Sequence, residues 1–268
     1  MGNYIFTDLA CETAKENCIK REKINEKLER AEIRGEYSDL SVTYFTPRLW
    51  LLENNDLALL TESMAREIRE VSDVMVSSTR IAQILVVGLG NPRLTPDSLG
   101  SQTVERILVT EPTEANECAL MAIAPDVSGN TGIETLEAVR AYVDRIKPDI
   151  VVIVDSLRAG SYERLGATVQ ISRGGISPGS GVGNTRAALT RDSLGVPVIS
   201  IGVPTVVSSS TLIYEAIERC GANVDNEELI SLLKNRLSFL VMPKEADVLI
   251  KIAAFIIADA INSAFSRR

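Results

Sequence analysis

The order of apolar and polar positions predicts an α/β domain over most of the chain. From Ile81 onward, short apolar runs alternate with amphipathic segments, a rhythm typical of βαβ units and of a mostly parallel sheet flanked by helices. Continuous apolar runs predict buried strands at Ile84–Gly88, Ile150–Val154 and Val196–Gly202. Weaker patterns predict further strands at Ala119–Ala124 and Thr168–Ser172, and helices at Ser98–Val109, Gly132–Ile146, Ser208–Arg219, Asp225–Phe239 and Glu245–Phe265.

The first eighty residues follow a different pattern. Residues 12–36 are crowded with Lys, Glu and Arg and show weak helical periodicity, so we expect a solvated helix or a mobile arm there. The alternating run Leu40–Phe45, ended by Pro47, predicts a strand, and residues 56–77 predict an amphipathic helix. We therefore expect residues 9–80 to form an N-terminal extension packed against a core that spans residues 81–268.

Charge and cysteine content narrow the function classes. The chain has 28 Lys and Arg against 36 Asp and Glu, a formal net charge of −8. Binding to nucleic acid therefore has no electrostatic support. The four cysteines form neither a CxxC motif nor a metal-ligand spacing, so we expect free thiols in a reducing compartment.

We expect a cytoplasmic protein with no membrane partner. Asp8 and Glu12 near the start argue against a signal peptide. The most apolar late run, Val248–Ile261, carries Lys251 and Asp259 and is too short to span a bilayer.

Two aspartates follow the strongest predicted strands, and the chain contains no histidine. A Ser-His-Asp or Cys-His triad is therefore excluded. We expect Asp97 and Asp155 in the loops or turns that leave their strands, at the sheet edge where open α/β folds bind ligands. Two carboxylates that share a proton can activate a water molecule. The alternatives are structural: Asp97 as a helix cap, and Asp155 as a carboxylate that caps the segment after it.

Other residues near these aspartates could bind a substrate. Gly88 and Gly90 resemble the start of a dinucleotide fingerprint, but Arg93 stands where the third glycine belongs, which argues against that function. Arg158 and Arg164 could each hold a carboxylate through a bidentate contact, or be ordinary surface arginines. The glycine-rich segment 174–184 could present backbone N–H groups to an anion or oxyanion, or be a flexible connection. Its candidate binding residues are Gly179, Gly181, Gly183 and Asn184.

Several long motifs together resemble the germination proteases of spore-forming bacteria. They are TDLACE at 7–12, LVVGLGN and LTPDSLG within 85–100, SGNTGIET at 128–135, KPDIVVIVDSL at 147–157, ERLGATVQIS and GISPGSGVGN within 163–184, LGVPVISIGVPTVV at 194–207 and MPKEADVLI at 242–250. The resemblance implies an aspartic-type endopeptidase that degrades small acid-soluble spore proteins during germination. It places the two essential aspartates at Asp97 and Asp155. It also implies a fold similar to that of hydrogenase maturation proteases, which is phosphorylase-like.

The resemblance further implies a self-processing zymogen that assembles as a homotetramer in the spore core. Its substrates are cut after Glu or Asp and before a hydrophobic residue followed by alanine, so Asp8–Leu9 is the expected processing bond and residues 1–8 the candidate propeptide. Hydrogenase maturation proteases bind nickel with two acidic residues and a histidine, which this chain lacks, so we expect no metal and no cofactor. We expect Arg164 to read the acidic side chain of the substrate, because Arg158 occupies a position shifted from the family pattern.

Two alternatives remain open at this stage. One is a metal-dependent maturation-type peptidase that uses both aspartates and a third oxygen ligand. The other is a non-enzymatic sporulation protein that keeps the same fold as a binding module.

Overall fold

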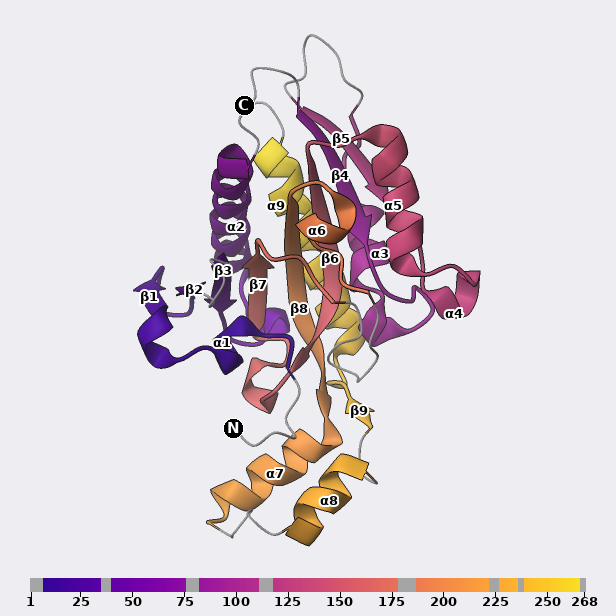
Figure 1. Cartoon of the computed structure of the whole chain (residues 1–268). Coiled ribbons are helices and arrows are strands. Elements are labelled where there is room, and N and C mark those ends of the chain that lie inside the picture. Colours follow the sequence, from indigo (N-terminus) through magenta and orange to yellow (C-terminus); the bar gives the residue numbers. More distant parts are fainter. Residues whose placement is uncertain are drawn as a thin grey trace.

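The protein is an α/β structure in which the described residues form one sheet of nine strands with helices on both faces (Figure 1). The computed structural model describes residues 7–34, 40–75, 82–110, 118–177, 187–221, 227–235 and 239–265. The predicted α/β class is confirmed. The sheet is mixed, however, because parallel pairing is confined to its centre and one edge.

Four strands make the parallel part of the sheet. They are β5 (Cys118–Ile123), β4 (Ala82–Gly88), β6 (Ile150–Ala159) and β8 (Val198–Ser208), paired in that order. Their continuous apolar runs are explained by burial on both faces, as is usual for parallel strands. The last residues of β8 also pair antiparallel with the short β9 (Leu240–Val241).

Four further strands extend the sheet from the other edge of β8. β7 (Thr168–Ser172) pairs antiparallel with β8. β3 (Leu40–Phe45), β2 (Glu29–Arg34) and β1 (Ile19–Lys23) continue the antiparallel extension outward in that order. β3 and β7 have the bounds that the sequence predicted.

The prediction of a helix or mobile arm at residues 12–36 was wrong, because this segment contains β1 and β2. Within its described part, residues 12–34, only the end of α1 (Ala10–Thr13) and a 3-10 turn, η1 (Glu16–Cys18), are helical. In β2 the apolar Ala31 and Ile33 are buried while the charged residues between them are less buried. β1 is an edge strand whose side chains are mostly exposed, so it carries no apolar alternation that a sequence pattern could reveal.

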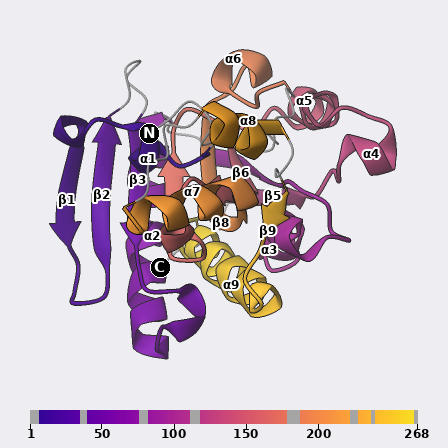
Figure 2. The same cartoon turned by 90° about the horizontal axis from the view of Figure 1, so that it is seen from below.

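Helices cover the two faces of the sheet in separate layers, which Figure 2 shows along the strands. One face carries α2 (Asn54–Met75), α3 (Leu99–Val104) and α9 (Ala246–Phe265), and it encloses the larger core. The other face carries α5 (Thr135–Ile146) and α6 (Arg191–Leu194) over a smaller core. α4 (Ser128–Thr131) is a single turn that precedes α5. α9 is long and apolar enough to cross a membrane, but its buried residues pack into the larger core against α2 and α3.

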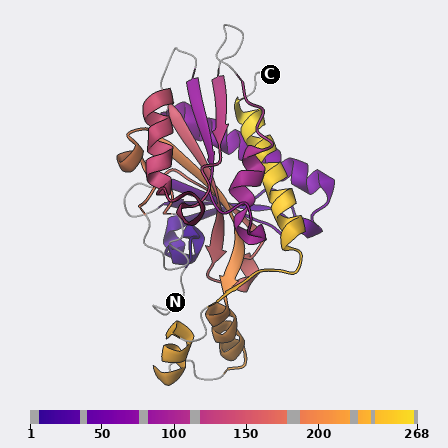
Figure 3. The ribbon, with the colours of Figure 1, turned by 90° about the vertical axis from the view of Figure 1, so that its right-hand side faces the viewer.

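Two more helices lie beyond the end of β8, away from the main body (Figure 3). α7 (Ser209–Arg219) continues directly from β8, and α8 (Glu227–Asn235) follows it. The Ser210 hydroxyl donates to the Leu233 carbonyl oxygen at 2.6 Å and ties the two helices together. These helices and α2, α5 and α9 confirm the predicted segments to within a few residues, whereas α3 ends at Val104 rather than Val109.

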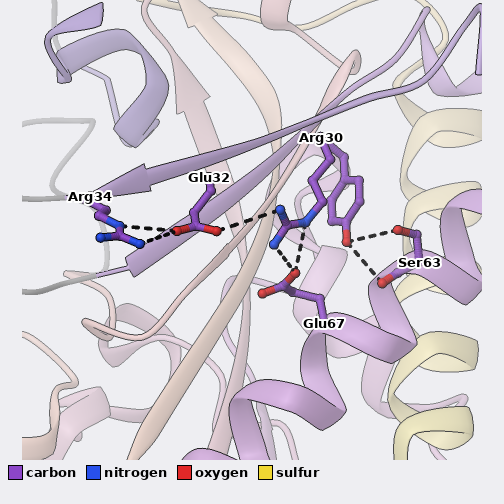
Figure 4. Close-up of polar contacts among 6 residues, drawn as sticks. Arg30, Glu32, Arg34, Ser63 and Glu67 are labelled. Atoms are coloured by element: carbon purple, nitrogen blue, oxygen red, sulfur yellow. Dashed lines mark hydrogen bonds and ion pairs between the residues drawn. The ribbon is translucent and has the colours of Figure 1, made fainter. Parts of the chain in front are cut away.

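A charged cluster fastens the antiparallel extension to α2 (Figure 4). Arg30 on β2 donates two hydrogen bonds to one oxygen of Glu67 on α2, at 3.1 and 2.6 Å. On its other side Arg30 faces Glu32, which in turn pairs with Arg34. Glu67 is almost fully buried. Removing one partner would therefore leave the other charge poorly solvated.

We predict that Glu67→Ala lowers the free energy of unfolding by about 1.5–3 kcal/mol, the scale of a charge-assisted hydrogen bond. Urea unfolding followed by circular dichroism measures the change. Glu62→Ala is the matched control on the same helix, because Glu62 is exposed and lies 3.9 Å from Arg66. That control should change stability by less than about 0.5 kcal/mol. Equal losses in the two variants would contradict a special role for the Arg30–Glu67 pair.

Candidate functional site

Asp97 lies in the loop that leaves β4, at the end of a 3-10 turn, η3 (Thr95–Asp97). The loop first turns at Gly90, whose φ of 99° favours glycine. A β-carbon at Gly90 would also collide with the carbonyl oxygen of Asp97. The Asp97 carboxylate accepts a hydrogen bond from the Asn91 N–H at 2.8 Å. Ser98, not Asp97, is the N-cap residue of α3, so the alternative of Asp97 as the cap of that helix was wrong.

Asp155 lies within β6 rather than after it, which corrects the expectation that it would occupy a loop or turn. β6 runs on to Ala159 because it stays paired with β8 well beyond the apolar run. Asp155 is only 7% exposed, and its carboxylate accepts a hydrogen bond from the Ser156 N–H at 2.8 Å. The sequence signal failed because Asp155, Ser156 and Arg158 interrupt the apolar run in the second half of this strand.

Contacts between the two segments bring the aspartates to the same end of the parallel strands. The Leu89 N–H, just after β4, donates to the Val154 carbonyl oxygen at 2.8 Å. The Thr205 hydroxyl on β8 donates to the Pro96 carbonyl oxygen at 2.6 Å. η3 therefore packs on β8 and on β6, the strand that carries Asp155.

A row of residues runs across three strands from Asp155. In the strand register, Asp155 on β6 lies beside Gly202 on β8, which lies beside Gln170 on β7. Gly202 has no side chain, and the Leu157 side chain packs over it where a β-carbon would lie. A hollow of about 270 Å³ opens over Gln170, Gly202 and Leu157.

The N-terminal segment 7–10 forms one wall of this hollow. The Asp8 N–H donates to the Arg158 carbonyl oxygen at 3.0 Å, and the Asp8 carboxylate accepts from the Arg158 N–H at 2.8 Å. Leu9 is 1% exposed. The Gln170 amide donates to the Asp8 carbonyl oxygen at 3.1 Å and accepts from the Ala10 N–H at 2.7 Å. The bond between Asp8 and Leu9 thus lies over the row that includes Asp155.

The two candidate arginines have different surroundings. Arg158 is 6% exposed; burial lowers its pKa, and the negative charge of Asp8 opposes that shift. Arg164, in a 3-10 turn (η4, Tyr162–Arg164), lies over the Phe45 ring with its guanidinium carbon 4.5 Å from the ring centroid. The Asp8 carboxylate of the docked segment therefore contacts the backbone of Arg158, and the choice of the arginine that reads the acidic side chain of a substrate stays a prediction.

The glycine-rich segment borders the hollow at its beginning. Gly175, Ile176 and Ser177 line it, and the Ser200 hydroxyl donates to the Gly175 carbonyl oxygen at 3.0 Å. The candidate binding residues of this segment lie outside the described residues: Gly179, Gly181, Gly183 and Asn184.

The residues near the aspartates do not fit the ligand set of two acids and a histidine. The chain has no histidine. Within the described ranges, no group of three or more Cys, Asp and Glu side chains could hold a metal ion. We therefore derive no chemical step through a metal.

Sequence reasoning missed Gln170. A signal was present, because Thr168–Ser172 alternates polar and apolar residues and the polar ones are also largely buried. Polar side chains on a buried strand face need partners. Only the docking of the distant N-terminal segment reveals which groups Gln170 binds.

Glu12 helps to hold the docked segment. Its carboxylate accepts from the Thr7 hydroxyl and from the Gly160 N–H, the latter at 2.7 Å. Burial raises the pKa of Glu12 above its ordinary value. The hydrogen bonds from Thr7 and Gly160 and the charge of Arg164 oppose this shift, while the charge of Glu215 adds to it.

Comparisons with known proteins agree on one family. The germination protease family profile matches residues 19–221. A germination protease of Caldanaerobacter subterraneus subsp. tengcongensis is 38% identical and aligns over 97% of this chain and 94% of its own length. A germination protease of Clostridium acetobutylicum is 35% identical over 98% of this chain and 95% of its own length.

Among solved structures, the crystal structure of the [NiFe] hydrogenase maturation protease HycI from Thermococcus kodakarensis KOD1 is 19% identical. It matches with a TM-score of 0.35 over 72% of this chain and 98% of its own length. A likeness this distant supports no inference about function.

We predict that the N-terminal segment docks more tightly as the pH falls. A raised pKa in the docked state means that docking favours the protonated carboxyl of Glu12, so docking weakens as the pH rises through the interval above the ordinary glutamate pKa of about 4.3. Hydrogen exchange at the Ala10 and Gly160 amides, corrected for intrinsic rates, should slow from neutral to mildly acidic pH.

Glu12→Gln should flatten this pH dependence, because its amide does not titrate. Glu16→Gln is the control, since the Glu16 side chain is 82% exposed, and it should keep the wild-type dependence. Equal pH dependence in wild type and Glu12→Gln would contradict the assignment to Glu12.

Proposed function

Because this chain belongs to the germination protease family, we propose that it is an endopeptidase that degrades small acid-soluble spore proteins when spores germinate. The observation that carries this proposal is the docked N-terminal segment. Its acidic Asp8 and buried Leu9 lie across the sheet beside the row that includes Asp155. A protein substrate would bind in the same way after this segment leaves.

Asp97 and Asp155 act as a pair on one water molecule. One carboxylate is ionised and takes a proton from the water, whose oxygen forms a bond to the carbonyl carbon. The other is protonated and donates to the carbonyl oxygen as negative charge develops there. The C–N bond then breaks, the leaving nitrogen takes a proton from the dyad, and a new carboxyl group and a free amine remain. Such acid–base catalysis contributes about 10²–10⁴ in rate.

Arg158 reads the acidic residue before the cleaved bond. Its backbone N–H binds the Asp8 carboxylate, and its buried cation needs an anion to offset the loss of hydration. The pocket that encloses Leu9 accounts for the hydrophobic residue after the bond. Together these contacts support cleavage after Asp or Glu and before a hydrophobic residue followed by alanine.

The same contacts support self-processing at Asp8–Leu9, with residues 1–8 as the propeptide of a zymogen. We also propose a homotetramer in the cytoplasm of the spore core, by analogy with the family. Small acid-soluble spore proteins are the only partners in this proposal, with no nucleic acid and no membrane.

We predict that Asp97→Asn and Asp155→Asn each lower the rate of cleavage of a small acid-soluble spore protein by at least about 10²-fold. The double variant should lose little more, because residues that act as a unit are non-additive. Thermal unfolding should confirm that each variant folds. Asp144→Asn, at an exposed position on α5, is the control and should keep wild-type activity.

Self-trimming is followed in the same samples. N-terminal sequencing of the wild-type product should begin at Leu9, and the Asp97→Asn protein should remain untrimmed. Activity that survives exhaustive chelation is expected. Near-normal turnover in either single variant would reject the dyad, and loss of activity on chelation would favour the metal-dependent alternative.

We predict that Arg158→Gln selectively slows cleavage after an acidic residue. On an aspartate-site peptide, kcat/KM should fall by an amount equal to about 1.5–3 kcal/mol, the scale of a charge-assisted hydrogen bond. An asparagine-site peptide should lose much less, because it carries no charge to pair. Arg164→Gln is the matched control and should affect both peptides equally. A selective loss in Arg164→Gln instead would move the role to that arginine.

A further inference from the structure

Gln170 binds the docked segment rather than its own domain. It lies in the middle of β7, between Thr43 on β3 and Gly202 on β8 in the strand register. Gln170 is only 9% exposed. Buried amides require hydrogen-bond partners, and both atoms of this amide find theirs on the N-terminal segment.

The two contacts lie on either side of one peptide bond. Nε2 donates to the carbonyl oxygen of Asp8, the residue before the Asp8–Leu9 bond. Oε1 accepts from the N–H of Ala10, the second residue after that bond. Both partners are main-chain groups, so Gln170 can bind any peptide that lies in this register, whatever its side chains.

We propose that Gln170 is a catalytic residue that clamps the main chain of the bound peptide across the cleaved bond and stabilises the oxyanion. This inference rests on the proposed function and deepens it. When the water oxygen bonds to the carbonyl carbon, an electron pair moves to the carbonyl oxygen, and the Nε2–H already points at that oxygen. When the tetrahedral intermediate collapses, the pair returns, the C–N bond breaks and the leaving nitrogen is protonated by the aspartates.

The position of Gln170 suits this role. Strand pairing on both sides fixes the backbone of β7 beside Gly202, so Gln170 lies two strand spacings, roughly 10 Å, from Asp155 across the sheet. A donor fixed before the reaction needs no reorganisation as charge develops. The neutral amide does not titrate, so it remains a donor at any pH at which the aspartates work.

The test uses the full chain and two peptides. One has the sequence of residues 5–14, and the other carries an ester oxygen in place of the Ala10 N–H that Gln170 binds. Gln170→Met keeps the side-chain size but removes both contacts. Gln170→Glu keeps an acceptor for Ala10 but loses the donor to the Asp8 carbonyl. Gln83→Met is the matched control, because Gln83 lies in β4 near its start, remote from the row.

Loss of one oxyanion donor lowers kcat by about 10²–10³-fold, so we expect this loss in both Gln170 variants and none in Gln83→Met. The ester peptide should be cut about tenfold less efficiently than the amide by wild type and by Gln170→Glu. Gln170→Met should cut the two peptides equally well, because it has no acceptor to lose. This loss of discrimination separates a clamp from a residue that merely supports the fold.

Wild-type kcat in Gln170→Glu would overturn the oxyanion role. A tenfold preference for the amide peptide that persists in Gln170→Met would overturn the clamp. If wild type that is already trimmed at Asp8–Leu9 cuts neither peptide, the proposed function fails, and the clamp is then judged by Kd. A Kd about tenfold weaker for the ester in wild type but not in Gln170→Met supports it, and equal values overturn it.

Discussion

The site depends on the register in which β8 pairs with both of its neighbours. That register puts Asp155, Gly202 and Gln170 in one row on one face of the sheet. A slip of one residue on either edge would turn its side chains to the opposite face. Ile199, Ile201 and Val203 prevent such a slip, because their burial in the larger core fixes which face of β8 each residue occupies. Core packing on one side of the sheet therefore fixes the side chains of the polar row on the opposite side.

The antiparallel extension is what turns a parallel sheet into a site. β7 contributes Gln170, and β3 supports β7 from its other edge. The extension is held in turn by Arg30 and Glu67, which join it to a helix on the far face. The parallel strands carry the aspartates and one main-chain contact to the docked segment, from the Asp8 N–H to the Arg158 carbonyl oxygen on β6. The antiparallel half adds the two main-chain contacts of Gln170.

The sequence predicted the parts of this molecule that local patterns control. Leu40–Phe45 and Thr168–Ser172 alternate cleanly and appear as strands with those bounds. β1 escaped prediction because an exposed edge strand needs no apolar face. β6 was predicted to end at Val154 because Asp155, Ser156 and Arg158 interrupt its apolar pattern. The aspartates could be placed at one end of the sheet by strand direction alone. Gln170 could not be assigned a role, because its partners lie 160 and 162 positions away in sequence.

The docked segment is a tethered ligand, and any other peptide must compete with it for the same contacts. A group held by a short flexible linker competes at an effective concentration on the order of millimolar. A free protein would have to bind far more tightly, or wait for the arm to detach. Breaking the Asp8–Leu9 bond would not by itself clear the hollow, because Leu9 and Ala10 stay attached to α1 and keep their burial and their contact with Gln170. Departure of the new N-terminus, rather than the cut itself, would then set when Gln170 becomes free to bind another peptide.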